Sequence, residues 1–300
     1  MDFYFEFEQK YRGSREQIKN RLSAYLPFVQ KCRSLYADCK ALDLGCGRGE
    51  WLELMQENGI DATGVDLNDA MVAYCTEKNF SCQKKDTLAA LKEAADESLC
   101  IVSGFHIAEH VPFDILMQLV HEAKRVLKPA GLLILETPNP ENPAVGSCNF
   151  YNDPSHIRPL TPVLLSFLPE HVGFHRTKIL RLQEDKRLHE PENLSLFHVL
   201  TGSSPDYSIV AQKQAAQELT VEFDSLFQAD YGITLEELCQ SYDSQLHQLI
   251  DRLNSTICEQ SSRIAAQERE LNELRGLIMN TRHRTLFGAV EWLLKKIKRT

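Results

Sequence analysis

Three glycines within five residues, Gly45, Gly47 and Gly49, are the feature of this sequence best suited to hold a ligand against the backbone. They follow an apolar run and precede an amphipathic one, so Leu42–Glu50 (LDLGCGRGE) predicts a strand, a loop and the start of a helix. Glycine lets such a loop turn tightly and lets a ligand come close, because there is no Cβ to clash. Loops of this kind bind nucleotides or nucleosides.

Glu50 distinguishes this loop from the dinucleotide-binding loops. Their pattern is G-x-G-x-x-G, with the pyrophosphate at the helix N-terminus, whereas the pattern here is G-x-G-x-G-E. A carboxylate in the place of the third glycine would repel a pyrophosphate. It is compatible with a ligand that has no phosphate and carries a positive charge, such as S-adenosylmethionine. The loop therefore argues against a dehydrogenase.

Carboxylates follow the next two apolar runs. Asp66 ends the second predicted strand, where it can accept hydrogen bonds from both hydroxyls of a ribose. Asp86 follows the third, where it can accept from an adenine amino group. Either acid alone is more often a helix N-cap or a solvated surface group, but their positions at successive strand ends favour a nucleoside site. Asp43, in the first strand, completes an acidic triplet that favours an active enzyme.

The elements that position these residues appear in the sequence as short apolar runs alternating with amphipathic stretches between residues 41 and 137. This alternation predicts βαβ units and a parallel sheet, and a turn at Lys128–Gly131 ends a helix before the fifth strand. The expected strands, which make a seven-stranded Rossmann-like α/β fold, are Ala41–Leu44, Ala62–Asp66, Phe80–Lys84, Leu99–Ser103, Leu132–Thr137, Arg176–Leu182 and Tyr207–Gln214. The expected helices are Glu50–Asn58, Asp69–Lys78, Thr87–Ala95, Pro112–Leu127 and Val163–His171.

Composition narrows the class of protein. The net charge of −9 argues against a protein that coats nucleic acid. The nine cysteines are odd in number and include no C-x-x-C pair, so they indicate neither a zinc site nor a disulfide framework, and we expect reduced thiols and no metal. The N-terminus does not resemble a signal peptide, and no run of about 18 apolar residues is present, so we expect a cytoplasmic protein.

The C-terminal region differs in kind. Between residues 246 and 280 a heptad repeat sustained over more than four heptads predicts a coiled coil and, through it, a homo-oligomer. The alternative is a long helix packed back on its own domain. One core position holds Ile250, Ile257, Ile264, Leu271 and Ile278, and the other holds Leu253, Gln260, Gln267 and Leu274.

Residues 281–300 predict a short basic amphipathic helix. Apolar side chains including Phe287 fall on one face with Trp292 near its edge, and residues 282–300 carry six cations against Glu291, a net charge of 6 − 1 = +5. Such a helix is typical of an anionic membrane surface. A helix that caps an oligomer is the alternative.

Residues 41–137 resemble the class I methyltransferases. The resemblance rests on D-L-G-C-G-R-G-E at residues 43–50, G-V-D at 64–66, A-E-H-V at 108–111 and L-K-P-A-G-x-L-x-L-E-T-P at 127–138. It implies S-adenosylmethionine as the cofactor. The first of these segments is the glycine loop described above.

Three further segments are similar to the methyltransferases that cap lipopolysaccharide O-antigen chains: Phe7–Glu16, Glu136–Asn142 and Phe150–His156. Some members of that group carry a kinase domain, a coiled coil and C-terminal membrane-binding helices. This chain has no kinase signature, so the resemblance implies methylation of a sugar hydroxyl rather than of a phosphate added by the same chain.

Methyl transfer to an alcohol needs a general base. His110 follows the fourth strand and His156 lies in a proline- and asparagine-rich insertion, so either is a candidate catalytic base. In the alternative interpretation His110 orients a loop and His156 caps a turn. Asp153 is an acceptor-binding candidate or only a turn residue. Phe105 and His106, at the end of the fourth strand, join the predicted cofactor-binding set.

The N-terminal segment, residues 1–35, is expected to be helical and to fold over the cofactor. The resemblance implies that Arg12 or Arg21 binds the cofactor carboxylate, although an amphipathic helix that only packs on the sheet explains the pattern equally well. The remaining expected divisions are a methyltransferase domain at 36–215, a linker or helix at 216–245, the coiled coil at 246–280 and the basic helix at 281–300.

The preferred hypothesis is an S-adenosylmethionine-dependent O-methyltransferase that methylates the non-reducing terminal sugar of a lipid-linked polysaccharide and stops chain growth. It would act at the inner face of the cell membrane, with a glycan or glycolipid acceptor and a polysaccharide polymerase as possible partners. One alternative is methylation of a small molecule such as a quinone precursor. The other is a non-enzymatic scaffold that binds the cofactor and recruits polysaccharide-assembly enzymes.

Overall fold

The computed structural model describes residue 10 and residues 13–191 and 193–298 of the 300-residue chain. The chain divides into two compact units, residues 1–241 and residues 242–300.

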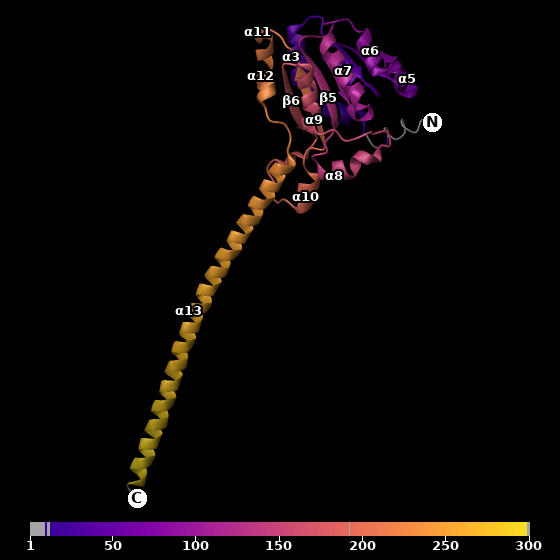
Figure 1. Cartoon of the computed structure of the whole chain (residues 1–300). Helices are drawn as coiled ribbons and strands as arrows, with labels where there is room; N and C mark the ends of the chain where they lie inside the picture. Colours follow the sequence, from indigo (N-terminus) through magenta and orange to yellow (C-terminus); the bar gives the residue numbers. More distant parts are fainter. Residues whose placement is uncertain (1–9, 11–12, 192, 299–300) are drawn as a thin grey trace. The chain divides into compact units, whose positions relative to one another are not determined.

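The first unit is built on one seven-stranded sheet with the strand order β3-β2-β1-β4-β5-β7-β6 (Figure 1). Strands β1 to β5 pair in parallel, and β7 runs antiparallel to both β5 and β6. The predicted seven-stranded Rossmann-like sheet is thus confirmed. The strands are β1 (Lys40–Leu44), β2 (Asp61–Asp66), β3 (Cys82–Lys84), β4 (Leu99–Phe105), β5 (Leu127–Pro138), β6 (Arg176–Leu182) and β7 (Asp206–Gln212).

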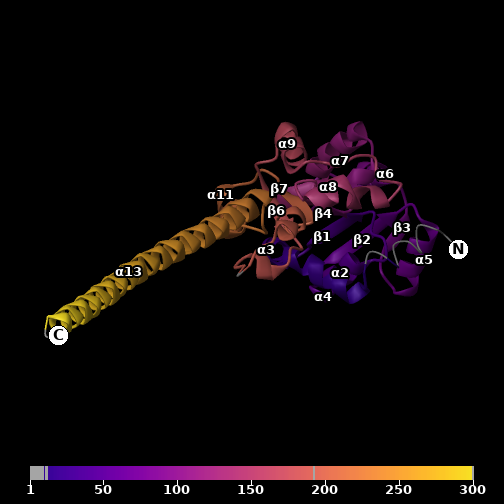
Figure 2. The same cartoon turned by 90° about the horizontal axis from the view of Figure 1, so that it is seen from below.

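Helices cover both faces of this sheet (Figure 2). On one face lie α6 (Thr87–Glu93), α7 (Phe113–Val126) and α9 (Pro162–Val172), and on the other lie α2 (Arg15–Leu22), α3 (Leu26–Leu35) and α4 (Glu50–Glu57). The predicted helices start and end within a few residues of these bounds. Other elements of this unit are η1 (Ser23–Tyr25), α5 (Asp69–Glu77), η2 (Ala108–His110), α8 (Pro143–Ser147), η3 (Asn149–Asn152), η4 (Lys186–Leu188) and α10 (Leu196–Thr201).

Strand β5 begins earlier than the sequence predicts. Helix α7 ends at Val126, as the proline and glycine that follow require, but residues 127–131 join the sheet instead of forming a free turn. Leu127 pairs with Leu99 and Leu132 with Ile101, so the strand bulges between them. Ala130 takes up the extra length in a left-handed conformation, with φ 58°.

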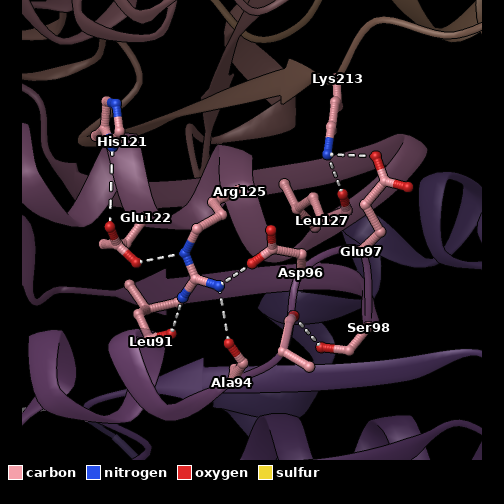
Figure 3. Close-up of polar contacts among 11 residues, drawn as sticks. Leu91, Ala94, Asp96, Glu97, Ser98, His121, Glu122, Arg125, Leu127 and Lys213 are labelled. Carbon is pink, nitrogen blue, oxygen red and sulfur yellow. Dashed lines mark hydrogen bonds and ion pairs between the residues drawn. The ribbon is translucent and has the colours of Figure 1, made fainter.

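Arg125 joins α7 to α6 at the edge of the sheet where the strands begin (Figure 3). Its guanidinium donates to the carbonyl oxygens of Leu91 at 2.8 Å and Ala94 at 3.0 Å, which close the end of α6. It also pairs with Asp96 and with Glu122. These bonds satisfy carbonyl groups that a helix end leaves without intrahelical partners.

Residues 217–238 pack against the rest of the first unit, so the segment 216–245, predicted as a linker or helix, belongs to that unit for most of its length. It forms α11 (Gln217–Thr220), η5 (Val221–Phe223) and α12 (Asp224–Gln228). The reason is apolar burial: Phe223 is fully buried in the core beside α3, and Leu238 is also buried.

Helix α13 (Leu235–Ile297) is one continuous helix of 63 residues. The predicted coiled coil and the predicted basic helix were expected to meet at residue 280. The structure shows no break in the helix there. In the single chain the heptad positions are open to solvent, for example Ile257 at 58 % and Ile264 at 56 % exposed. Among the described residues, no helix is long and apolar enough to cross a membrane.

Candidate active site

The glycine loop connects β1 to α4 at the edge of the sheet where the parallel strands end. Gly45, Gly47 and Gly49 have φ angles of 70°, 52° and 74°, a left-handed region that side chains other than glycine rarely adopt. The amide groups of Gly45 and Cys46 donate to the carbonyl oxygen of Val65 at 2.8 and 3.0 Å. The loop is therefore fixed against the end of β2. Its three glycines add no side chains to its surface.

Asp66 fastens the same loop from the other side. Its Oδ2 accepts from the Gly47 amide at 3.0 Å, and its Oδ1 accepts from the Asn68 amide at 2.8 Å. The next side chain, Leu67, is 63 % exposed. A carboxylate next to an exposed apolar side chain suits a nucleoside, because the ribose hydroxyls need an acceptor and the base needs an apolar face.

Glu50 has a different environment from the one the sequence suggested. It is buried and pairs with the Nε of Arg48 at 2.9 Å. Because Arg48 balances its charge, Glu50 does not present a net negative charge at the start of α4. The electrostatic argument against a pyrophosphate is therefore weaker than the sequence implied, and the identity of the ligand rests on other evidence.

Arg15 is a functional residue that sequence reasoning missed. From the start of α2 it donates to the carbonyl oxygens of Arg48 at 2.7 Å and Gly49 at 3.2 Å, and it pairs with Glu53. It thereby attaches the N-terminal helical segment to the glycine loop. It lies within the Phe7–Glu16 segment of the resemblance, but nothing in that segment marks this arginine as a contact of the loop.

The other predicted cofactor residues have several environments. Asp86 is exposed and caps α6, its Oδ1 accepting from the Ala89 amide at 3.0 Å. Asp43 is buried between β1 and β4 and accepts from the Ser103 hydroxyl at 2.7 Å, so its side chain positions strands. Phe105 is buried between Tyr25 and Trp51, so its side chain serves packing.

Arg12 lies outside the described residues. Arg21 is exposed, and its charge acts on the carboxylate of Asp206 at the start of β7. This charge lowers the pKa of Asp206, but burial raises that pKa by more. Burial and the nearby Glu136 together raise the pKa of Asp206 to about 6.

His106 is the centre of a charged cluster where β4, β5 and β7 meet. Its Nδ1 lies 3.2 Å from Glu109, and its Nε2 lies 3.4 Å from Glu136 and 3.9 Å from Asp206. Its backbone is left-handed, with φ 56°, and its amide donates to the Glu136 carbonyl oxygen at 2.9 Å. Tyr25, which lies in η1 between α2 and α3, donates to the Glu136 carboxylate.

This cluster holds a proton on His106. Burial disfavours the charged imidazole, but hydrogen bonds to Glu109 and Glu136 outweigh it and raise the pKa of His106 well above its usual value. In the same way, burial raises the pKa of Glu109 while His106 lowers it, and the net shift is downward. His106, which is half-buried, and the fully buried Glu109 therefore form an ion pair.

The two histidines predicted as bases lie together. The rings of His110 and His156 are 4.7 Å apart, although the residues come from η2 and from the insertion after β5. The backbone amide of Ile157 donates to the Glu109 carbonyl oxygen at 2.9 Å, and Phe150, itself buried, packs on the His156 ring. The insertion is thus attached to the end of β4.

Hydrogen bonding assigns the protons in this pair. Nδ1 of His156 lies 2.5 Å from the Phe150 carbonyl oxygen, which can only accept, so this nitrogen carries the hydrogen. Ser155 donates to Asp153, so Nδ1 of His110, 3.0 Å from the serine oxygen, donates to it. In each neutral ring the lone pair is therefore on Nε2. That atom of His156 lies 4.0 Å from Glu109 and 3.9 Å from Asp153.

The asparagines of the P-N-P-E-N segment have a structural role. Asn139 donates to the Ser204 carbonyl oxygen at 2.8 Å. Asn142 donates to Ser203 at 2.6 Å and accepts from two amides at the start of α8. They fix the loop between β6 and β7 beside the end of β5. The Glu136–Asn142 segment of the resemblance therefore contributes to the shape of the site.

The comparisons with known proteins decide the class. A family model described as "Methyltransferase domain" matches residues 11–182, more than half of the chain, and the match includes the glycine loop and Asp66. The chain belongs to the S-adenosylmethionine-dependent methyltransferases. It is an enzyme, and its cofactor is S-adenosylmethionine. The scaffold alternative is therefore not supported.

Two curated relatives illustrate the match. The chain is 31 % identical over 167 residues to a probable S-adenosylmethionine-dependent methyltransferase of Mycolicibacterium smegmatis, covering 56 % of this chain and 60 % of the relative. It is 30 % identical over 119 residues to a ubiquinone biosynthesis O-methyltransferase of Methylococcus capsulatus, covering 38 % and 49 %. The chain thus spans about half to three-fifths of the length of these relatives.

Solved structures support the same fold. A methyltransferase of Archaeoglobus fulgidus is 34 % identical, with a TM-score of 0.63, covering 71 % of this chain and all of that one. The methyltransferase partner of the Haloferax volcanii Trm112 activator is 14 % identical, with a TM-score of 0.53, covering 72 % of this chain and 99 % of the other, and is similar in fold alone.

The histidine environments predict opposite titration behaviour. Burial, the larger effect, lowers the pKa of His110, whereas the pKa of His106 is raised. In an NMR pH titration we expect His110 to take up its proton only below its ordinary value of about pH 6.5, and His106 to remain protonated well above that value. Stability contributed by His106 is then present below its unfolded pKa and lost as the pH rises through the raised one. The variants His106→Gln and His110→Gln assign the signals, and a His106 signal that titrates near pH 6.5 contradicts the account.

Proposed function

We propose that this methyltransferase transfers the methyl group to a hydroxyl of a terminal sugar on a lipid-linked polysaccharide, with the His110–His156 pair as the base. The observation that carries this proposal is that pair, placed against Glu109 at the end of β4. When bound, S-adenosylmethionine supplies an electrophilic methyl group on a sulfonium, and an alcohol attacks it best when its proton is removed.

Within the pair, His156 is the stronger candidate for the base. Its Nε2 carries the lone pair and lies about equally far from the Glu109 and Asp153 carboxylates. These charges stabilise the imidazolium that forms when the ring accepts a proton. His110, whose pKa burial lowers, is neutral at pH 7 and adds no competing positive charge beside it.

The surroundings favour an acceptor rich in hydroxyl groups. A cavity of about 630 Å³ lies in the loop between β6 and β7, at the same edge of the sheet as His106. Polar side chains such as Glu184, Arg187 and His198 line it. Carboxylates, guanidinium groups and imidazoles can pair with the hydroxyls of a sugar.

Helix α13 supports a membrane-associated acceptor. Its heptad positions are exposed in the single chain and suit a homo-oligomer. Its last turns present Phe287, Trp292 and Ile297 with basic neighbours, a composition suited to an anionic lipid surface. On this proposal the enzyme works at the inner face of the cell membrane, where a polysaccharide polymerase is a candidate partner. A helical rod over residues 246–278, 33 residues long, would extend about 50 Å from the membrane.

A quinone precursor is the second candidate acceptor. The curated relatives named ubiquinone biosynthesis O-methyltransferase favour it, and O-methylation is the chemistry common to both proposals. Their matches cover 38 % and 33 % of this chain, however, and α13 has no evident use in an enzyme for a freely diffusing acceptor.

The acceptor is tested by incubating the full chain with labelled S-adenosylmethionine and a panel of membrane-derived glycolipids, followed by linkage analysis. We expect label on a terminal sugar hydroxyl. His156→Gln should lower kcat by about 10²- to 10⁴-fold. His171→Gln, on α9, is the control and should retain activity. Transfer to a quinone precursor and to no glycolipid would refute the preferred acceptor.

Membrane attachment is tested by deleting residues 282–300. The deletion removes a net charge of +5 and the exposed apolar face, so the truncated enzyme should no longer sediment with vesicles containing an anionic phospholipid. Its activity on a soluble acceptor should persist. Neutral phosphatidylcholine vesicles serve as the control surface, and undiminished sedimentation with anionic vesicles would show that the anchor lies elsewhere.

A further inference from the structure

Three thiols gather on the reverse side of the glycine loop. Cys46 lies within the loop, Cys75 in α5 and Cys82 at the start of β3. Their sulfur atoms all lie within 4.8 Å of one another, and the Sγ atoms of Cys46 and Cys82 are 3.3 Å apart. The spacing of these residues along the chain matches no metal-binding motif, so the sequence predicted no metal there.

The distances fit a shared metal ion. Zinc–thiolate bonds are about 2.3 Å long, so three thiolates around one ion lie about 4 Å from each other. The separation of Cys46 and Cys82, 3.3 Å, is somewhat shorter than this value, and no two of the three sulfur atoms are more than 4.8 Å apart. Thiolates select soft ions such as zinc and copper(I) over magnesium or calcium.

The surroundings allow an ion to enter. Cys75 is fully buried and Cys46 nearly so, whereas Cys82 is half-buried and gives access from solvent. Apolar Leu52 and Phe80 pack around the group.

We propose that Cys46, Cys75 and Cys82 bind one soft metal ion, of the zinc or copper(I) class, and that the bound ion weakens the binding of S-adenosylmethionine. The coupling runs through Gly47. The Cys75 thiol donates to the Gly47 carbonyl oxygen at 3.3 Å, and the Gly47 amide donates to Asp66. A metal-bound thiolate has no proton to donate, so Gly47 loses a partner and the loop shifts. By linkage, the cofactor weakens metal binding by the same factor.

The test titrates the full, reduced chain with Cd²⁺, a soft probe ion, and follows the thiolate-to-metal charge-transfer absorption. We expect a site of one Cd²⁺ per chain. In Cys82→Ser the affinity of that site should fall at least about tenfold. The matched control is Cys148→Ser, whose exposed thiol lies outside the cluster and whose loss should leave the affinity unchanged.

Binding of S-adenosylhomocysteine in metal-free buffer establishes that each variant is folded. In the wild type, saturating Cd²⁺ should weaken that binding, and in Cys82→Ser the same concentration should not. The proposed site is overturned if the reduced wild type takes up no Cd²⁺ or if Cys82→Ser binds it as tightly. The proposed coupling is overturned if saturating Cd²⁺ leaves the affinity for S-adenosylhomocysteine unchanged.

Discussion

The rest of the site depends on the bond between the Asp66 carboxylate and the Gly47 amide. A loop with three left-handed glycines has many conformations available when free, and it needs fixed contacts at both ends to form a binding surface. Asp66 and the Val65 carbonyl oxygen fix it from β2, and Arg15 fixes it from α2. The bond thus holds the loop and the Asp66 carboxylate together as one surface.

The acceptor side is organised by a second constraint, the partial burial of a charged histidine. Taking an imidazolium out of water is costly unless it is paired, and His106 has the carboxylates of Glu109 and Glu136 beside it. Glu109 in turn contacts His156, and Tyr25 contacts Glu136. Strands β4 and β5, the N-terminal segment and the insertion therefore each supply a residue to this one group of contacts.

The alternation of short apolar runs with amphipathic stretches was enough to predict the sheet, because the apolar residues of a buried parallel strand are adjacent in the sequence. The positions of Asp66 and Asp86 at strand ends followed from the same pattern. It could not predict Arg15, the charge balance between Arg48 and Glu50 or the thiol group of Cys46, since these depend on contacts between distant segments. The prediction of a linker or helix at 216–245 left the packing of that segment open for the same reason: burial of Phe223 is visible only once the core is assembled.

The account is tested most directly by the affinity of Asp66→Ala for S-adenosylhomocysteine, measured by calorimetry beside Asp61→Ala, an exposed acid at the other end of the same strand. Loss of charge-assisted hydrogen bonds should weaken binding by about 10- to 100-fold in Asp66→Ala. Asp61→Ala should bind as the wild type does, and circular dichroism should show both variants folded. Equal affinity of a folded Asp66→Ala and the wild type would contradict the account.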